Sequence, residues 1–259
     1  MSDLEPKSIR LSVVIPTYNK EARIAASLDA VVAYLTGKPY ASEVVVVDDG
    51  SSDLTADVAR AALSGRLPAK IICRERNLGK GASVREGVLA SSGELVLFCD
   101  DDLSTPIEEL DKAVAALEEG ADVVIGSRAL PDSEIRVRQR RPREWMGKAF
   151  NVLVRLFVLK GYRDTQCGFK AFRRAAARDI FSRLRTPGFG FDVEVLLLCR
   201  DLGYRVAEIP VVWCDARPSR VRIFRGSWGM LMDLWRIRRQ ARRDARRRPG
   251  RGGGGSDRD

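Results

Sequence analysis

The chain has 259 residues, of which 45% are hydrophobic and none is histidine. This predicts one substantial core and excludes Ser-His-Asp or Cys-His catalysis as well as any histidine-ligated metal. The net charge is +10, but ten arginines against three aspartates fall between Arg236 and Asp259, so the basic excess belongs chiefly to this tail.

The first half of the chain alternates strand-like and helix-like segments. Short, β-branched, nearly continuous apolar runs predict buried strands at Leu11–Pro16, Glu43–Val47, Lys70–Cys73, Glu94–Phe98 and Ala121–Ile125. Helical patterns separate them at Glu21–Thr36, Leu54–Ser64, Ala82–Ser91 and Pro106–Glu119. The alternation predicts an α/β protein with a Rossmann-like, mostly parallel central sheet flanked by helices, whose ligands bind at the carboxyl ends of the strands.

The second half is less regular. We expect helices at Arg143–Leu159, Ala175–Arg183 and Val193–Leu202, a polar loop at Asp164–Lys170 and a late strand near Arg205–Trp213. An amphipathic, Arg-rich helix is expected over residues 228–249, with Trp228, Leu231, Leu234 and Trp235 along one face. The Gly-rich residues 250–259 are expected to be disordered. The chain is therefore expected to hold one main domain over residues 1–227.

Three consecutive carboxylates, those of Asp100, Asp101 and Asp102, follow the fourth predicted strand. If side chains alternate there as in a strand, Asp100 and Asp102 share one face and Asp101 points to the other. Two carboxylates on one face suit an Mg²⁺ or Mn²⁺ ion that bridges a diphosphate. The alternative is a strand end before a helix, which explains Thr105 and Glu108 as a capping box but not the three carboxylates.

Two further segments suit a nucleotide. Asp48 and Asp49 follow the second predicted strand and are placed to accept hydrogen bonds from a base or ribose. A Gly-rich, basic segment with Asn77, Gly79 and Lys80 enters the next predicted helix, an arrangement that can bind anions. It matches neither the P-loop nor the dinucleotide-binding pattern, so its signal is weak on its own.

Together these segments resemble glycosyltransferase family 2. The matching motifs are Pro16-Thr17-Tyr18-Asn19, Asp48-Asp49-Gly50-Ser51, Asn77-x-Gly79-Lys80-Gly81 and Asp100-x-Asp102. Gly126-Ser127-Arg128 and the later segments at Asp164–Lys170 and Gly190–Glu194 resemble the dolichyl-phosphate β-glucosyltransferases and their bacterial polyprenyl-phosphate relatives. The resemblance covers roughly Leu11 to Trp213. It implies a GT-A fold, a nucleotide-diphosphate sugar donor, Mg²⁺ or Mn²⁺, and inversion at the anomeric carbon.

The resemblance also implies roles for particular residues. Asp100 and Asp102 are expected to bind the metal. The expected donor nucleotide site comprises Pro16, Tyr18, Asn19, Glu21, Asp48, Asp49, Asn77, Gly79, Lys80 and Asp100. Two positions depart from the family pattern. Lys20 stands where the family usually has Glu, so either Glu21 takes over that role or the contact is lost, and Asp101 stands where the family prefers a small residue.

The implied acceptor is a polyprenyl or dolichyl phosphate. Its phosphate is largely dianionic at neutral pH, with a second pKa near ~6, so it needs cationic positioning more than deprotonation. Arg128, Arg136, Arg138 and Arg140 are expected to bind this phosphate, against the alternative of a solvated basic loop.

Two carboxylates are candidates for a catalytic role beside the acceptor. Asp192 is favoured, because it corresponds to the acidic position that acts as base in many relatives of this fold. Asp164 is the second candidate, and it is alternatively held in a structural pair with Arg163 or Lys170.

We therefore expect an inverting glycosyltransferase that moves glucose from UDP-glucose onto a lipid phosphate. It is expected to be cytoplasmic, peripheral on the inner face of the membrane, with its basic helix on anionic lipid. Alternatives are a GDP-mannose-dependent enzyme, a family 2 transferase with a non-lipid acceptor and a sugar nucleotidyltransferase, although the Gly-rich N-terminal loop of the last is missing. A nucleic-acid-binding protein is a further alternative, against which the confinement of basic charge to the tail argues.

Overall fold

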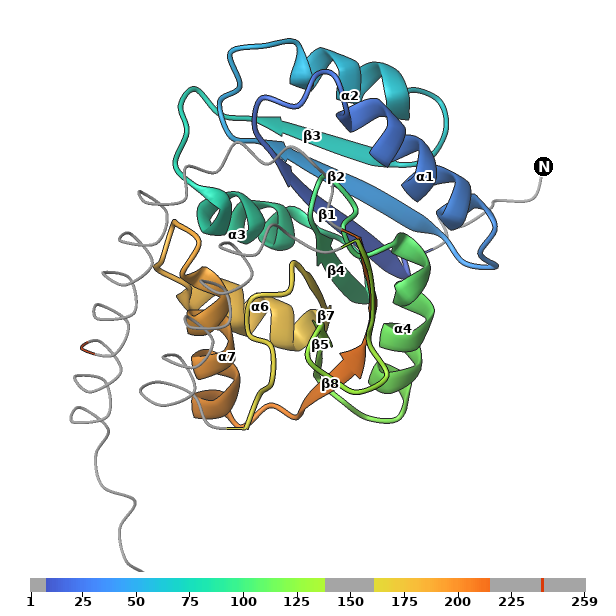
Figure 1. The fold of residues 1–259 in the computed structure, drawn as a ribbon. Helices are drawn as coiled ribbons and strands as arrows, with labels where there is room; N and C mark the ends of the chain where they lie inside the picture. Colours follow the sequence, from blue (N-terminus) through green and yellow to red (C-terminus); the bar gives the residue numbers. More distant parts are fainter. Residues whose placement is uncertain (1–7, 138–160, 215–238, 240–259) are drawn as a thin grey trace, which may run out of the picture.

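The computed structural model describes residues 8–137, 161–214 and Arg239 (Figure 1). The predicted helices at Arg143–Leu159 and at residues 228–249, the predicted disordered segment 250–259, and the candidate phosphate ligands Arg138 and Arg140 therefore lie outside the described residues, Arg239 apart. They stay predictions.

A seven-stranded sheet forms the centre of the described molecule, with the strand order β3-β2-β1-β4-β7-β5-β8. Its strands are β1 (Leu11–Thr17), β2 (Ser42–Asp48), β3 (Ala69–Cys73), β4 (Leu95–Cys99), β5 (Val123–Ser127), β7 (Phe169–Arg173) and β8 (Val206–Pro210). Strands β3, β2, β1 and β4 pair in parallel, as do β5 and β8, whereas β7 runs antiparallel to both β4 and β5. The predicted mostly parallel sheet is confirmed.

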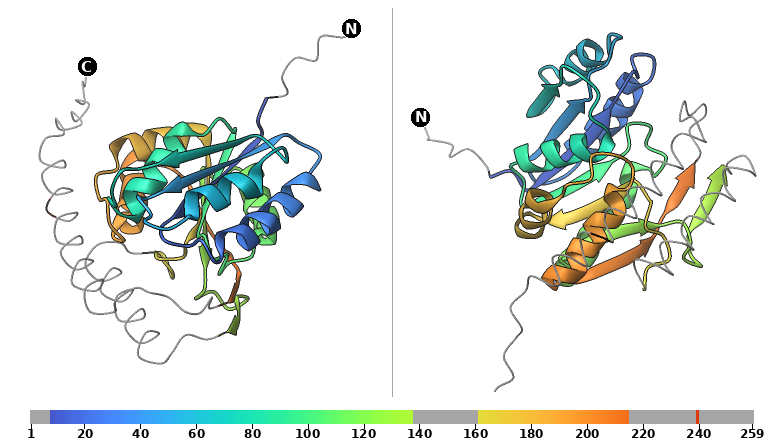
Figure 2. Two further views of the ribbon diagram at one scale, coloured as in Figure 1. Left: turned by 90° about the horizontal axis from the view of Figure 1, so that it is seen from above. Right: turned by 90° about the vertical axis from the view of Figure 1, so that its left-hand side faces the viewer.

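Helices cover both faces of this sheet (Figures 1 and 2). One core cluster joins one face to α1 (Ile24–Thr36), α2 (Thr55–Leu63), the 3₁₀ helix η1 (Ile107–Glu109) and α4 (Leu110–Glu118). A second cluster joins the opposite face to α3 (Lys80–Ala90), α6 (Arg174–Arg183) and α7 (Phe191–Leu202). Every residue of β1, β2 and β4 is buried as a result, which is why these strands are apolar without alternation.

Two sequence-based expectations about the later strands were wrong. The polar loop predicted at Asp164–Lys170 ends in β7, because Phe169 and Lys170 already pair with β4. The late strand is interrupted at Val211, so that β8 joins the main sheet whereas β9 (Val212–Cys214) pairs with β6 (Glu134–Val137) in a separate two-stranded sheet.

The capping box expected at Thr105 and Glu108 is also absent from this described segment. The 3₁₀ turn η1 begins at Ile107 without a side-chain cap hydrogen bond, and the Thr105 hydroxyl contacts the Cys167 sulfur at 3.7 Å instead. Thr105 is buried, so it serves the packing between two loops and not a helix end.

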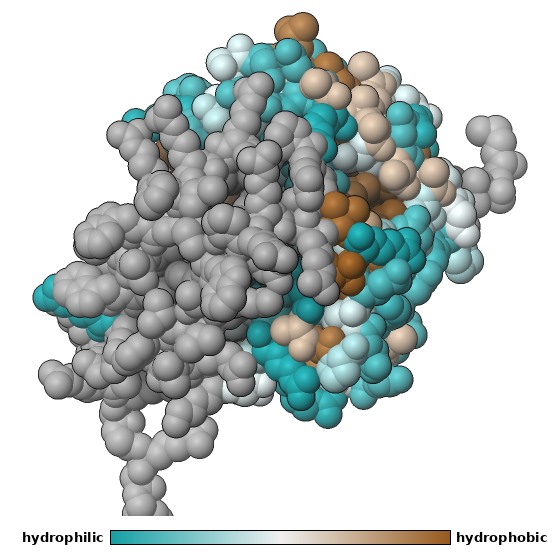
Figure 3. Space-filling model, viewed as in Figure 1, coloured by the Kyte–Doolittle hydropathy of each residue, from teal (hydrophilic) through white to brown (hydrophobic). Residues whose placement is uncertain are grey.

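The face of the molecule shown in Figure 3 is mainly hydrophilic where residues are described, with small separate apolar patches. The large hydrophobic side chains exposed in the described part are Tyr18, Leu54, Leu78, Val137 and Phe189. Within the described residues, no helix combines the length and the apolar character that crossing a membrane requires.

Candidate functional site

Three polar segments meet where β1, β2 and β4 end. The strands are adjacent and parallel, with Pro16 opposite Val47 and Val14 opposite Phe98, so their carboxyl ends lie at the same end of the sheet. The segments that follow them contain Tyr18 and Asn19, Asp48 and Asp49, and Asp100 to Asp102. The topology thus brings the predicted donor and metal residues together, at the end of the sheet where such folds bind ligands.

Asp49 holds the Gly-rich segment in place. Its Oδ1 accepts the backbone N–H of Leu78 at 2.9 Å, and its Oδ2 accepts that of Gly79 at 2.8 Å. Arg74 Nη1 donates to the same carboxylate at 3.0 Å, and Asp49 is only 4% exposed. These bonds give Asp49 a structural role, and its contact with a base or ribose stays a prediction.

The glycines of this segment are required by close packing against the residues before α7. A Cβ on Gly79, whose φ is +106°, would lie 2.5 Å from the carbonyl oxygen of Pro187. A Cβ on Gly81 would lie 2.5 Å from the carbonyl oxygen of Thr186 and 2.6 Å from Phe191 Cβ. Real Cβ atoms do not approach so closely, so the segment fits only with glycine at both positions. Asn77 is exposed beside it.

Asp48 and Asn19 order the loop that follows β2. The Asp48 Oδ1 accepts hydrogen bonds from the backbone N–H and the hydroxyl of Ser51. Asn19, which has a φ of +52°, accepts the backbone N–H of Ser52 at 2.9 Å through its Oδ1. Its own N–H donates to the Ser51 hydroxyl at 2.8 Å. The two motif segments are thus joined by side-chain to backbone bonds.

The other predicted donor residues of this region differ in exposure. Pro16 is buried within β1, whereas Tyr18 is 43% exposed at its end. Glu21 accepts the backbone N–H of Leu54 at 2.9 Å, so this carboxylate supports the start of α2. The roles of these residues toward a nucleotide stay predictions.

The three consecutive aspartates lie in a turn, so the expected strand alternation does not apply. Strand β4 ends at Cys99, and each carboxylate after it has a different partner. Asp100 pairs with Lys80 Nζ at 2.6 Å, and Asp101 pairs with Lys20 Nζ at 3.1 Å. Asp102 Oδ1 accepts the backbone N–H of Ser104 at 3.0 Å. The orientation of the Asp101 side chain is therefore set by its ion pair with Lys20 and not by alternation along a strand.

Asp100 also connects the first half of the chain to the second. Its backbone N–H donates to the carbonyl oxygen of Gly168 at 3.2 Å. Its carboxylate lies so close to Gly168 that a Cβ there would be 2.5 Å from Asp100 Cγ. A side chain at this position would displace the Asp100 carboxylate, so the segment before β7 forms one side of the predicted metal site.

Asp164 is ion-paired with Arg128, not with Arg163 or Lys170. Arg128 donates from Nε at 2.6 Å, from Nη2 at 2.9 Å and from its backbone N–H at 3.1 Å. Burial alone would raise the pKa of the Asp164 carboxyl, but the Arg128 charge and hydrogen bonds outweigh it and lower the pKa to about 2. Glu208 accepts the backbone N–H groups of Arg163 and Asp164, which fixes the start of this segment.

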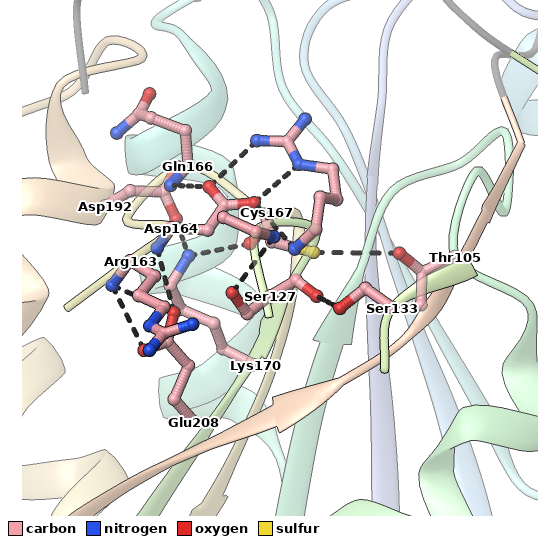
Figure 4. Close-up of polar contacts among 12 residues, drawn as sticks. Thr105, Ser127, Ser133, Arg163, Asp164, Gln166, Cys167, Lys170, Asp192 and Glu208 are labelled. Atoms are coloured by element: carbon pink, nitrogen blue, oxygen red, sulfur yellow. Dashed lines mark hydrogen bonds and ion pairs between the residues drawn. The ribbon is translucent and has the colours of Figure 1, made fainter. Parts of the chain in front are cut away.

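Asp192 and Lys170 form a buried ion pair (Figure 4). Lys170 is 0% exposed and Asp192 only 3%, and the lysine also donates to the carbonyl oxygen of Cys167 at 2.7 Å. Burial raises the pKa of the Asp192 carboxyl, although Lys170 opposes this shift. Lys170 lies on β7 and Asp192 on α7, so the pair links these two elements. The role of Asp192 as a base stays a prediction.

The arginines predicted to bind phosphate are not all in one place. Arg128 uses two guanidinium nitrogens on Asp164, and its guanidinium lies 5.7 Å from the Trp213 ring. Arg136 is exposed on β6 and paired with Glu134 at 3.0 Å. The structure thus gives both described arginines a carboxylate partner, and their contact with an acceptor stays a prediction.

Sequence reasoning did not predict the contacts that three residues make in this site: Lys20, Lys170 and Gly168. Lys170 has a sequence signal, since it stands between Phe169 and Ala171-Phe172 in a run that is otherwise apolar. Lysine is almost never fully buried unless paired, so such a position predicts a buried acidic partner. Lys20 stood out in the sequence only as a departure from the family pattern, and the partners of Lys20 and Gly168 could not be predicted because they are distant in sequence.

The carboxylates at the end of β4 fit a divalent cation that is shared with a ligand. No group of three or more Asp, Glu or Cys side chains in the described part of the chain could hold a metal ion by itself. Mg²⁺ is commonly bound by one or two carboxylates together with substrate phosphates. Asp100 and Asp102 supply such a pair, so the oxygen donors present suit a cation bound with a diphosphate.

Comparison with known proteins identifies the family. Residues 12–181 match the model of glycosyl transferase family 2. A dolichyl-phosphate beta-glucosyltransferase of Trichomonas vaginalis is 35% identical over 90% of this chain and 72% of its own length. The mouse dolichyl-phosphate beta-glucosyltransferase is 37% identical over 88% of this chain and 75% of its own length.

Solved structures show the same fold. Glucosyl-3-phosphoglycerate synthase from Mycobacterium tuberculosis, in complex with Mn²⁺, UDP-glucose and phosphoglyceric acid, has a TM-score of 0.67 at 23% identity, covering 89% of this chain and 80% of that one. Mannosyl-3-phosphoglycerate synthase from Rubrobacter xylanophilus has a TM-score of 0.70 at 20% identity, covering 96% and 79%. The chain belongs to glycosyltransferase family 2 and is a glycosyltransferase with the GT-A fold.

Proposed function

We propose that this enzyme transfers glucose from UDP-glucose to a polyprenyl or dolichyl phosphate, with inversion at the anomeric carbon. A phosphate oxygen of the lipid forms the new bond to that carbon while the bond to the diphosphate of the donor breaks, which leaves a glucosyl phospholipid and UDP. The curated relatives named above support the acceptor class. A GT-A structure in complex with UDP-glucose supports the donor class.

The donor is proposed to bind where β1, β2 and β4 end. Pro16, Tyr18, Asn19 and Asp48 would surround the nucleoside, since their backbone or side chains lie at that end of the sheet. Asn77 and the Gly-rich segment would border it on the side that Asp49 fixes. Lys80 would face the diphosphate, because it begins α3 and its ammonium lies 2.6 Å from Asp100 Oδ1.

Asp100 and Asp102 would hold an Mg²⁺ or Mn²⁺ ion together with the donor diphosphate. Such a cation, when bound, offsets negative charge on the departing UDP. Lys80 would contribute positive charge at the same place. Burial lowers the pKa of its ammonium, but the charges of Asp100 and Asp192 outweigh burial and raise this pKa, so Lys80 stays protonated. The protein groups therefore position and neutralise the leaving group.

One observation carries the choice of a phosphate acceptor: both candidate bases are tied to basic side chains. Asp192 is neutralised by Lys170, and Asp164 is neutralised by Arg128. A hydroxyl acceptor needs a carboxylate that is free to take its proton during transfer. A phosphate dianion needs none, so a site whose nearby carboxylates are engaged suits it better.

The enzyme is further proposed to work at the cytoplasmic, inner face of the membrane, because a polyprenyl phosphate cannot leave the bilayer and the enzyme must reach it there. The support is sequence alone: aromatic residues at helical spacing followed by ten arginines from Arg236 onward. Each basic residue near an anionic leaflet contributes ~1 kcal/mol, so a few of them suffice for reversible binding.

The proposal is tested by offering UDP-glucose and GDP-mannose separately to the full chain, with polyprenyl phosphate and Mn²⁺, and identifying the lipid product by mass spectrometry. A hexosyl phospholipid formed from UDP-glucose is the expected result. Product from GDP-mannose alone would contradict the donor assignment. Faster transfer to a simple alcohol or free sugar would contradict the acceptor assignment.

A further inference from the structure

The ion pair between Lys20 and Asp101 joins the two positions that depart from the family pattern. Lys20 Nζ lies 3.1 Å from Asp101 Oδ1, and the two side chains are 33% and 10% exposed. The backbone of Lys20 is fixed, because its N–H donates to Thr55 Oγ1 at 2.7 Å and its carbonyl oxygen accepts the N–H groups of Arg23 and Ile24 at 2.9 Å. The ammonium group therefore reaches Asp101 from the rigid junction between β1 and α1.

The turn that carries Asp101 holds three carboxylates close together. It is closed by the N–H of Leu103 donating to the carbonyl oxygen of Asp100 at 3.1 Å, and Leu103 has a φ of +46°, which is rare for a residue with a side chain. Adjacent carboxylates repel each other. Lys20 pairs with Asp101 and Lys80 pairs with Asp100, so two of the three negative charges have different cationic partners.

We propose that Lys20 is a positioning residue that keeps Asp101 out of the cation site and thereby sets which cation the site prefers. This inference rests on the proposed function, since it takes Asp100 and Asp102 as the carboxylates that share a cation with the donor diphosphate. With Asp101 held by Lys20, the protein offers that cation two carboxylates of the turn. Without Lys20, nothing else in the described structure is paired with Asp101, and a third carboxylate becomes available.

The number of carboxylates matters because divalent cations differ in what they accept. Mg²⁺ demands near-octahedral geometry, keeps several waters and is bound by one or two carboxylates plus phosphates. Ca²⁺ takes six to eight oxygen ligands in flexible geometry, and its affinity rises with the number of charged ligands. A third carboxylate in the same turn therefore favours Ca²⁺ more than Mg²⁺, beyond the general attraction that any added negative charge exerts on both.

The test compares Ca²⁺ and Mg²⁺ binding to the full chain by isothermal titration in the presence of UDP. Lys20→Met keeps the apolar stem and removes the charge, and it should raise the ratio of Ca²⁺ to Mg²⁺ affinity by on the order of tenfold. Lys20→Arg should keep the wild-type ratio, because the guanidinium can still pair with Asp101. Lys20→Met combined with Asp101→Asn should return the ratio to the wild-type value.

Lys38→Met is the matched control, since it removes one lysine charge from an ion pair with Asp111 outside the site. It should leave the ratio unchanged. Equal changes in Ca²⁺ and Mg²⁺ affinity for Lys20→Met would mean that charge alone acts, and would overturn the inference. A double variant that keeps the shifted ratio would also overturn it, because Asp101 would not be the group involved. If the wild-type chain binds neither cation with UDP, the proposed cation site and this inference both fail.

Discussion

The buried Lys170–Asp192 pair gives a stability prediction that can be worked out from the structure. Lys170→Met leaves Asp192 without its partner in a place where its side chain is 5% exposed. Breaking a buried pair by removing one partner costs about 3–5 kcal/mol, because the remaining charge is uncompensated. The variant also loses the hydrogen bond to the carbonyl oxygen of Cys167, which adds about 1 kcal/mol.

We therefore expect Lys170→Met to lower the free energy of unfolding, measured by urea titration with circular dichroism, by about 5 kcal/mol. The melting temperature should fall by roughly 10 °C. The double variant Lys170→Met, Asp192→Leu removes both charges and should recover most of the loss, because replacing a buried pair by apolar groups is often neutral.

An exposed ion pair supplies the control for this measurement. Arg60 and Asp57 are paired at 2.6 Å with side chains 53% and 70% exposed, so Arg60→Met should cost less than about 1 kcal/mol. A loss of under 1 kcal/mol for Lys170→Met would refute the argument that the pair is buried and charged. A double variant as unstable as the single one would attribute the loss to packing instead.

Three further predictions follow from the site and the tail. Arg128 lowers the pKa of Asp164 in the folded protein to about 2, compared with ~3.9 for an unfolded aspartate. The ionised Asp164 therefore stabilises the fold above about pH 4, and about 2 kcal/mol of this stabilisation is lost as the pH falls toward 2. Acid unfolding of Asp164→Asn should be correspondingly less pH-dependent between pH 4 and 2, and an unchanged profile would contradict this. Asp102→Asn and an excess of chelator should each abolish transfer, and added Mn²⁺ or Mg²⁺ should restore the activity of the chelated enzyme but not that of the variant. Full activity in excess chelator would contradict the metal assignment. Deleting Arg236 to Asp259 should weaken sedimentation with anionic vesicles at physiological salt without changing UDP-glucose binding, and equal sedimentation would show that this tail is not the anchor.

The central strands could be predicted from sequence because their environment is uniform. Strands β1, β2 and β4 are buried on both faces by helices, so their apolar runs are continuous and identify them locally. The acidic residues after β2 and β4 could be placed at one end of the sheet for the same reason, since parallel strands end together.

The partners of the site residues could not be predicted, because they come from distant parts of the chain. Asp49 accepts from Leu78 and Gly79, Arg128 pairs with Asp164 across 36 residues, and Lys20 pairs with Asp101 across 81. Local pattern fixes which residues are polar, but only the folded topology decides which of them neutralise one another. Position along the chain alone therefore did not show that Asp49 supports the Gly-rich segment.

The antiparallel strand β7 brings Gly168 to the predicted metal site, so a substitution at Gly168 tests the position of Asp100. Strand β7 lies between β4 and β5, with Phe169 opposite Cys99. Because β4 and β7 are antiparallel, Gly168, which precedes Phe169, lies beside Asp100, which follows Cys99. Because a Cβ at Gly168 would lie 2.5 Å from Asp100 Cγ, Gly168→Ala must displace this carboxylate. The displaced group is the end of a flexible, 35% exposed side chain, so the loss of stability should stay within about 1 kcal/mol. Transfer should fall by at least ~10-fold, since a 1 Å misplacement in a catalytic site can cost more than that. Gly37→Ala, where the added Cβ would meet its nearest atom at an ordinary 3.4 Å, is the control and should keep full activity. Full activity in Gly168→Ala would mean that the position of Asp100 seen here is not the one used in transfer.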